Sequence, residues 1–265
     1  MSINFCMDLK GHAVVFGASG GIGYEIALAL AENGVTHLSF TYGGNKVAAE
    51  ELAAKLRERH VSSYYSSVNL SDDIAVQAFL ADAVEAQGGE EIRYMVNSVG
   101  ISPNKPLLEQ TLESTGSGDD KGWRDVFEVN VNGSFITTRA VAKRMWKKGI
   151  SGSIVLITST NGINSYSQIS AHYDASKAAQ SLMMRIAAEE FAPYAVRING
   201  VAPGWINTKM NDTLPDDERA QETARIKMGR WADPREIAAP VVFLLSDDAS
   251  YICGQNLMVD GCYRA

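Results

Sequence analysis

A tyrosine and a lysine stand four residues apart in the segment Tyr173-Asp-Ala-Ser-Lys177. On a helix this spacing places both side chains on one face. A free tyrosine has a pKa of about 10 and is a poor base at neutral pH, but a nearby cation favours the phenolate and lowers that pKa. The pair therefore indicates acid–base chemistry at a substrate oxygen, although an ordinary surface pair has the same spacing.

A glycine-rich segment, Gly17-Ala-Ser-Gly-Gly-Ile-Gly23, follows the apolar run at 13–16 and precedes a helical pattern. Glycines allow a tight turn, and a helix N-terminus offers unpaired N–H groups and the positive end of the helix dipole. These features suit a phosphate, and they also suit a purely structural turn. The spacing is Gly-x3-Gly-x-Gly rather than the GxGxxG of the usual dinucleotide fingerprint.

The same segment contains GxSxG, which is the nucleophile elbow of α/β-hydrolases and would make Ser19 a nucleophile. His37, His60 and His172 would then be available as its base. Such elbows usually follow several strands, whereas this one follows the first, and a hydrolase leaves the tyrosine–lysine pair unexplained. A serine hydrolase therefore stays an alternative.

The elements that must position these residues alternate along the chain. Short apolar runs predict strands at 13–16, 37–40, 63–68, 94–96, 154–157, 196–201 and 257–259. Helical periodicity follows the glycine turn at Ile22, Ile26, Ala29 and Leu30. Further helices are predicted at 46–59, 74–86, 123–148, 175–191 and 234–245. This alternation predicts an α/β fold: a single, doubly wound parallel sheet of about seven strands with helices on both faces.

The chain has 265 residues, which suits one domain that spans 1–265. The polar, glycine-rich stretch 113–122 is predicted to be a surface insertion, and 207–227 is predicted to form a lid over the substrate. The net charge of −7 argues against nucleic acid and anionic membranes as partners.

Metal chemistry and secretion find no support in the sequence. The three cysteines, Cys6, Cys253 and Cys262, show no CxxC spacing, and the four histidines show no HExxH pattern. No signal peptide and no apolar run of about 20 residues is visible. We therefore expect a cytoplasmic protein without a metal.

The glycine turn and the tyrosine–lysine pair together resemble the short-chain dehydrogenase/reductase family. Further segments agree in order along the chain: Asn97-Ser-Val-Gly100, Asn130 within Val-Asn-Val-Asn-Gly, Ser159, Pro203-Gly204 with Thr208, and Val259-Asp-Gly261. The resemblance covers essentially the whole chain. Within the family, the chain resembles in general 3-oxoacyl-carrier-protein reductases and sugar or polyol dehydrogenases.

The resemblance implies an oxidoreductase that transfers a hydride between a nicotinamide cofactor and a carbonyl or secondary alcohol. Tyr173 would be the general acid/base, Lys177 would lower its pKa and hold the nicotinamide ribose, and Ser159 would bind the substrate oxygen. Asn130 would anchor a proton-relay water. The cofactor would be bound by Gly17, Ser19, Gly21, Ile22, Gly23, Thr41, Asn69, Leu70, Asn97, Gly100, Tyr173, Lys177, Pro203, Gly204, Ile206 and Thr208.

The sequence departs from the family pattern at two places, and the first leaves the identity of the catalytic hydroxyl open. The serine usually precedes the tyrosine by 13 residues, but Thr160 holds that position here and Ser159 is one residue earlier. The neighbours of Ser159 favour it as the catalytic hydroxyl, with Thr160 as the alternative. Cys262 stands where a second glycine is common in the family.

Cofactor preference is usually decided after the second strand, where an acidic residue binds the ribose of NAD and repels the phosphate of NADP. The segment 40–46, Phe-Thr-Tyr-Gly-Gly-Asn-Lys, has no carboxylate. Thr41, with Asn45 or Lys46, could instead bind a phosphate. NADP(H) is therefore favoured over NAD(H).

Substrate and assembly follow from the resemblance alone. A small carbonyl or alcohol, including an acyl thioester, is the expected substrate, and the loop sequences do not separate these classes. A catalytically dead dinucleotide-binding regulator is a further alternative, which the set Asn130, Ser159, Tyr173 and Lys177 argues against. The family also implies a homotetramer built through the helices at 123–148 and 175–191.

Overall fold

The computed structural model describes residues 7–115, 120–211 and 214–264. Within them, seven strands form one parallel sheet in the order β3-β2-β1-β4-β5-β6-β7. The strands are β1 (His12–Phe16), β2 (His37–Tyr42), β3 (Ser62–Ser67), β4 (Ile92–Asn97), β5 (Gly152–Ile157), β6 (Val196–Pro203) and β7 (Asn256–Val259). The strands β1 and β5 are fully buried because helices cover both faces of the sheet.

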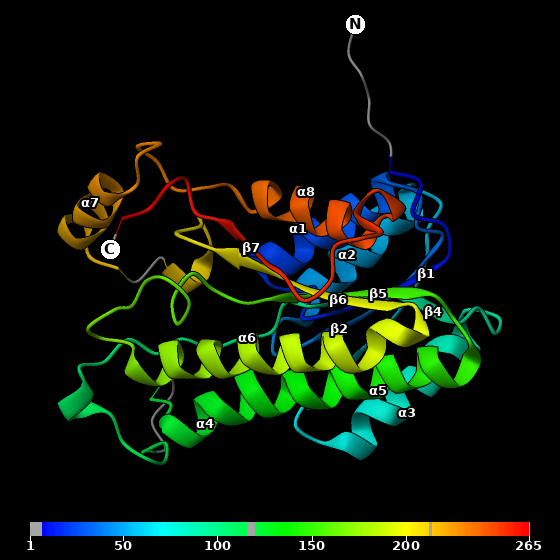
Figure 1. The fold of residues 1–265 in the computed structure, drawn as a ribbon, viewed down its shortest axis with the longest axis horizontal. Helices are drawn as coiled ribbons and strands as arrows, with labels where there is room; N and C mark the ends of the chain where they lie inside the picture. The colour runs from blue at the N-terminus through cyan, green and yellow to red at the C-terminus, as the bar shows by residue number, and fades with distance from the viewer. Residues whose placement is uncertain (1–6, 116–119, 212–213, 265) are drawn as a thin grey trace, which may run out of the picture.

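Two groups of helices sandwich the sheet (Figure 1). The helices are α1 (Gly21–Glu32), α2 (Lys46–Glu58), α3 (Asp73–Ala86), α4 (Trp123–Phe127), α5 (Gly133–Lys148), α6 (Ala171–Phe191), α7 (Asp216–Arg225) and α8 (Pro234–Leu245). One hydrophobic core lies between the sheet and α1, α2 and α8. The second core lies between the sheet and α3, α5 and α6. The predicted α/β doubly wound sheet is confirmed.

Most predicted elements agree with the structure to within a few residues, and one differs in kind. The helix predicted over 123–148 is divided into α4, a π-helical turn η2 (Glu128–Asn132) and α5. The buried side chain of Asn130 lies in this turn. Its oxygen accepts a hydrogen bond from the backbone N–H of Ile101, and its amide nitrogen donates one to the carbonyl of Ile101. A π-turn of this kind often marks a functional position in a helix.

Short 3-10 turns complete the chain: η1 (Leu107–Glu109), η3 (Ala192–Tyr194), η4 (Lys209–Asn211) and η5 (Asp247–Ala249). In the predicted surface insertion, residues 116–119 lie outside the described part. The predicted lid contains η4 and α7, and its residues 212 and 213 also lie outside. No helix of the described residues is long and apolar enough to cross a membrane.

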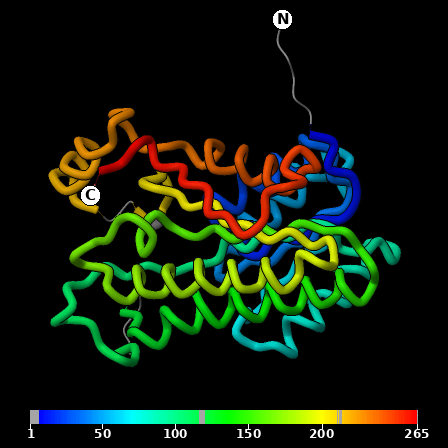
Figure 2. Tube along the Cα trace, viewed as in Figure 1, coloured from blue at the N-terminus to red at the C-terminus, as the bar shows by residue number. Residues whose placement is uncertain are grey.

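Contacts with three other segments hold α7 in place. The guanidinium of Arg219 lies 3.8 Å from the ring centroid of Trp231. The carboxylate of Glu222 accepts hydrogen bonds from Trp205 Nε1 (3.1 Å) and from the Tyr263 hydroxyl (2.6 Å). Figure 2 shows the C-terminal segment running beside α7. The predicted lid is therefore fastened to the body of the molecule at both the loop before α8 and the C-terminal segment.

Candidate active site

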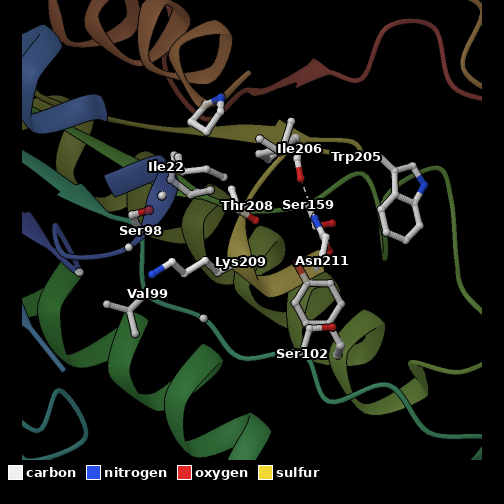
Figure 3. A pocket seen from close by; sticks show the side chains of 18 of the residues that line it. Ile22, Ser98, Val99, Ser102, Ser159, Trp205, Ile206, Thr208, Lys209 and Asn211 are labelled. Atoms are coloured by element: carbon white, nitrogen blue, oxygen red, sulfur yellow. Dashed lines mark hydrogen bonds between the residues drawn. The ribbon is translucent and has the colours of Figure 1, made fainter. Parts of the chain in front are cut away.

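A cavity of about 780 Å³ lies at the carboxyl edge of the sheet. Its walls come from the glycine turn after β1, from Ser98 to Gly100 after β4, from Ser159 after β5 and from Pro203 at the end of β6. The strand order reverses between β1 and β4, and ligands of doubly wound sheets bind at such a switch point. In Figure 3, Ile22 and Trp205 lie at opposite ends of the cavity, with Ser159 between them.

Close contacts leave no room for a Cβ at two glycines of the turn, Gly21 and Gly23. A Cβ on Gly23 would lie 2.2 Å from the carbonyl oxygen of Gly17, and one on Gly21 would lie 2.9 Å from Thr208 Cγ2. Gly17 has a φ of +85°, which favours glycine. No side chain caps the N-terminus of α1, so its first N–H groups face the cavity without a side-chain acceptor. This cradle fits the phosphates of a dinucleotide.

Thr41 has a different place from the one expected. Its side chain is 2% exposed and does not line the cavity. Its hydroxyl oxygen accepts a hydrogen bond from the backbone N–H of Gly17 at 3.1 Å. Thr41 therefore supports the glycine turn from behind, and a phosphate in the cavity would meet the turn rather than this hydroxyl.

Tyr173 and Lys177 lie one turn apart near the start of α6, as the spacing predicts, and both line the cavity. The ammonium of Lys177 lies 5.7 Å from the centroid of the Tyr173 ring. Burial lowers the pKa of Lys177 to about 7. Burial also raises the pKa of Tyr173 to about 12, against the opposing effect of a hydrogen bond with Ser159. In the chain alone, desolvation thus outweighs the lowering of the tyrosine pKa that the resemblance implies.

Ser159 and Thr160 both follow β5, and their hydroxyls make different contacts. The Ser159 side chain bonds to Tyr173, and its oxygen accepts the backbone N–H of Asn161 at 3.1 Å. The Thr160 hydroxyl instead donates to the carbonyl of Pro203 at 3.3 Å. The serine is thus the hydroxyl next to the tyrosine, while the threonine ties β5 to β6.

Asn130 is fully buried and does not line the cavity. Its amide donates to the Ile101 carbonyl and to Ser176 Oγ, both at 3.0 Å, and its oxygen accepts the Ile101 N–H at 2.8 Å. Ser176 in turn donates to the carbonyl of Tyr173 at 2.6 Å. Asn130 thereby joins the loop after β4 to the helix that carries Tyr173 and Lys177.

The expected cofactor-binding residues divide into two groups. Those that line the cavity are Gly17, Ser19, Gly21, Ile22, Gly100, Tyr173, Lys177, Pro203, Gly204, Ile206 and Thr208. Those that do not are Gly23, Thr41, Asn69, Leu70 and Asn97. Asn97 bonds to Thr137 and to the N–H of Val99, so it shapes the end of β4. Asn69 is exposed and accepts the N–H of Ser71.

Three further residues at this site have no role that the sequence motifs predict. Ser98 lines the cavity beside the glycine turn. Lys209 extends from η4 across the cavity toward Ser98 and Val99 (Figure 3). Gln180 is buried against Lys177. Its position three residues after Lys177, on the same helix face, is a signal that the sequence does contain.

The donor set and the cavity discriminate between classes of enzyme. Ser19 lines the cavity, but none of the four histidines does, so the site lacks the base of a serine hydrolase. Within the described residues, no group of three or more His, Cys, Asp or Glu side chains could hold a metal ion. A parallel sheet with a phosphate cradle after β1, and a half-buried tyrosine beside a buried lysine on the helix after β5, is typical of a nicotinamide-dependent oxidoreductase.

The chain belongs to the short-chain dehydrogenase/reductase family. A family model described as enoyl-(acyl carrier protein) reductase matches residues 17–264. The 3-oxoacyl-[acyl-carrier-protein] reductase FabG of Staphylococcus aureus is 32% identical over 96% of this chain and 98% of its own length. Galactitol 2-dehydrogenase (L-tagatose-forming) of Cereibacter sphaeroides is 36% identical over 95% and 94%.

Solved structures agree with this assignment. A short-chain type dehydrogenase/reductase from Mycobacterium marinum superposes with a TM-score of 0.86 at 28% identity and covers 100% of both chains. A 3-oxoacyl-[acyl-carrier protein] reductase from Brucella melitensis gives a TM-score of 0.84 at 28% identity, over 98% of this chain and 94% of its own. The protein is thus an oxidoreductase that acts on CH–OH or C=O groups.

Proposed function

We propose that the protein reduces a carbonyl to a secondary alcohol, or the reverse, with Tyr173 as the proton donor or acceptor. The observation that carries this proposal is that Tyr173, Ser159 and Lys177 line one cavity, where a hydrogen bond with the Ser159 side chain opposes the rise in the pKa of Tyr173. Two hydroxyl groups that meet at one point can bind one substrate oxygen between them. The bound nicotinamide supplies or accepts the hydride.

The residues of the chain then divide the remaining work. Ser159 holds the substrate oxygen, and Tyr173 donates a proton to it as the C=O double bond becomes the C–O single bond of an alcohol. A raised pKa keeps the phenol protonated near pH 7, so it is ready to donate in the direction of reduction. Lys177, when charged, stabilises the phenolate that remains. Asn130 fixes the position of the loop at Ile101 relative to the start of α6, because it forms hydrogen bonds with Ile101 and Ser176.

We also propose a preference for NADP(H) over NAD(H). Gly43, Asn45 and Ala48 line the cavity where β2 leads into α2, and no carboxylate is among them. The N-terminus of α2 at this point is the positive end of a 13-residue helix and suits a phosphate. Glu25 also lines the cavity, but it is paired with Arg235 at 2.9 Å.

A single substitution tests this preference. The side chain of Asn45 caps α2 by accepting the N–H of Ala48 at 3.1 Å, and aspartate can make the same cap. We expect Asn45→Asp to weaken NADPH binding about tenfold or more and to leave NADH binding within about twofold, because only the 2′-phosphate meets the added charge. Fluorescence titration with both reduced cofactors measures this. A wild-type protein that prefers NADH contradicts the proposal.

Two classes of substrate remain candidates, each with its own support. The relatives named as 3-oxoacyl-carrier-protein reductases favour a 3-oxoacyl thioester. The cavity wall beyond Ser159 favours a compact polyhydroxylated substrate, because it is rich in side chains that form hydrogen bonds. These are Ser102, Asn104, Asn161, Ser167, Ser170 and Asn211, beside the aromatic Trp205.

A substrate panel followed at 340 nm separates these classes. It contains simple ketones, 3-oxoacyl thioesters, an enoyl thioester and keto-sugars, each with NADPH and with NADH. The proposed function predicts cofactor oxidation with at least one carbonyl substrate. A selective response to 3-oxoacyl thioesters identifies the first class, and a selective response to keto-sugars identifies the second. A panel in which only the enoyl thioester reacts would overturn the proposed chemistry.

Assembly as a homotetramer is a further part of the proposal. Its support is a group of exposed apolar side chains on the neighbouring helices α5 and α6: Phe135, Trp146, Leu182 and Ile186. Apolar surface of this kind commonly marks a contact between subunits.

A further inference from the structure

A buried amide lies directly against the lysine of the proposed active site. Gln180 follows Lys177 by three residues on α6 and is fully buried. Lys177 Nζ donates a hydrogen bond to Gln180 Oε1 at 3.0 Å and a second one to the Ile157 carbonyl at 2.9 Å. The Ile157 carbonyl belongs to the backbone and is present whatever the side chain at that position. The Gln180 amide is therefore the one of these two acceptors that depends on a side chain.

The orientation of the amide is fixed from its other end. Gln180 Nε2 donates to Ser134 Oγ on α5 at 2.7 Å, and Ser134 is also fully buried. An ammonium group has donors and no acceptor, so the amide oxygen must face Lys177 and the amide nitrogen must face Ser134. A continuous chain of hydrogen bonds therefore runs from α5 through Gln180 to Lys177.

Two of the three N–H groups of the ammonium are thus engaged. The third is left for the side where the Tyr173 ring and Gly100 lie: the ring centroid is 5.7 Å from Nζ, and a Cβ on Gly100 would be 3.4 Å from it. This is the side that lines the cavity. With the amide oxygen removed, the ammonium would lose the contact that sets the direction of its third N–H.

We propose that Gln180, oriented by Ser134, is a positioning residue that holds the Lys177 ammonium in its charged form and directs it toward Tyr173 and the cavity. The effect on turnover rests on the proposed function, whereas the effect on Lys177 itself does not. Gln180 acts through Lys177 and does not itself line the cavity.

The charge environment of Lys177 makes this amide important. Burial alone lowers the pKa of the lysine, to about 7, and no charged side chain of the described residues opposes it. Tyr173 is the titratable group that faces Lys177 from α6. The groups facing it from β5, η2 and α5 are neutral: the Ile157 carbonyl, Asn130, and Ser134 through the amide. A hydrogen bond from the charged form favours that form, so losing the amide oxygen should lower the pKa further.

Competitive labelling of the full-length protein with acetic anhydride over pH 5–10 tests the proposal without any substrate. Mass spectrometry of the Lys177 peptide gives the apparent pKa of this lysine. We expect the pKa to fall by about one in Gln180→Leu, since one hydrogen bond to a charged group is lost. In Gln180→Glu we expect it to rise by at least one, because a carboxylate keeps the acceptor and adds an opposite charge. Ser134→Ala should shift it in the same direction as Gln180→Leu, but less.

Gln87→Leu is the matched control. Gln87 is also buried, at the end of α3, and bonds to Ser62 rather than to the active site. It should leave the pKa of Lys177 unchanged while lowering the unfolding temperature. An unchanged pKa in both Gln180 variants overturns the proposal, and so does an equal shift in Gln87→Leu. If Gln180→Leu does not fold, the rise in Gln180→Glu and the fall in Ser134→Ala still decide. Failure of the proposed function would appear separately, as a wild-type protein that oxidises no reduced cofactor in the substrate panel.

Discussion

The side chains of Tyr173 and Lys177 line the same cavity. Desolvation raises the pKa of the tyrosine and lowers the pKa of the lysine, so it favours the neutral form of each. A protonated phenol is the state that carbonyl reduction needs, because the reduced oxygen must gain a proton. The reverse reaction needs the phenolate, which the raised pKa makes scarce at neutral pH. The two directions should therefore depend differently on pH.

We expect kcat for carbonyl reduction at saturating cofactor not to rise between pH 6 and pH 9. The proton on Tyr173 is present throughout this range because its pKa is raised to about 12, and loss of the Lys177 charge can only lower the rate. The kcat for alcohol oxidation should rise with pH over the same range, because the population of the Tyr173 phenolate increases. Initial rates at 340 nm in both directions measure this. A reduction rate that climbs with pH would show that Tyr173 does not donate the proton.

The neighbouring hydroxyls Ser159 and Thr160 give a second prediction for single residues. Ser159→Ala should lower kcat/KM about 10²-fold or more, because the alanine cannot hold the substrate oxygen beside Tyr173. Thr160→Ser, which keeps the hydroxyl that bonds to Pro203, should stay within about threefold. Steady-state kinetics on both variants, with cofactor binding measured in parallel, checks the pair. Full activity in Ser159→Ala would contradict the assignment.

Residue types and order reveal some of these roles and hide others. The spacing of Tyr173 and Lys177 is sufficient to place them on one face of α6, because helix geometry is fixed. Thr41 lies near the glycine turn in the sheet, but whether its hydroxyl faces a ligand or the Gly17 N–H depends on packing between β1 and β2. The choice between Ser159 and Thr160 likewise depends on which hydroxyl faces α6, which spacing alone leaves open.

At the scale of elements, the turn between β1 and α1 shows how backbone contacts restrict sequence. Gly23 packs against the Gly17 carbonyl, whereas Gly20 has its nearest neighbour at 3.7 Å and an extended backbone. Only the first of these positions is closed to a side chain.

We therefore expect Gly23→Ala to destabilise the fold by about 1–3 kcal/mol, since its Cβ would overlap the Gly17 oxygen and force the turn open. Cofactor binding should weaken with it. Gly20→Ala is the control on the same turn and should cost about 1 kcal/mol or less. Urea unfolding of both variants compares them. Equal stabilities would show that the turn relaxes without cost.

The π-helical turn that divides the helix predicted over 123–148 could not be predicted from the sequence. The apolar periodicity continues through 128–132, so the sequence reads as one helix. The extra residue of the π-turn is visible only once Asn130 bonds to Ile101, which lies 29 residues earlier in the chain. Long-range contacts of this kind have no local signal.

At the scale of the whole molecule, the sheet was predictable because each buried parallel strand is a short apolar run between helices. The polar character of the cavity beyond Ser159 could not be predicted, because its side chains come from three loops, after β4, β5 and β6, whose approach only the fold determines. The exposed apolar side chains on α5 and α6 support the proposed association of several copies of the chain.

Sedimentation at micromolar concentration should give a mass of four chains of 28.7 kDa each. Ile186→Glu should shift the protein to smaller species, because it places a charge on the exposed apolar face of α6. Leu108→Glu alters an equally apolar residue on η1, which is 98% exposed, and should leave the mass unchanged. A wild-type monomer would contradict the proposed assembly.

In the proposed function, Tyr173 exchanges a proton with the substrate, and a bound nicotinamide would exchange the hydride. The most direct test of this proposal compares wild type with Tyr173→Phe on the best carbonyl of the substrate panel, with NADPH binding measured by fluorescence. We predict that the wild type forms one alcohol for each NADPH oxidised, and that the variant loses about 10²- to 10⁴-fold in kcat while its affinity for NADPH stays within about threefold. A variant with unchanged turnover would contradict the proposal.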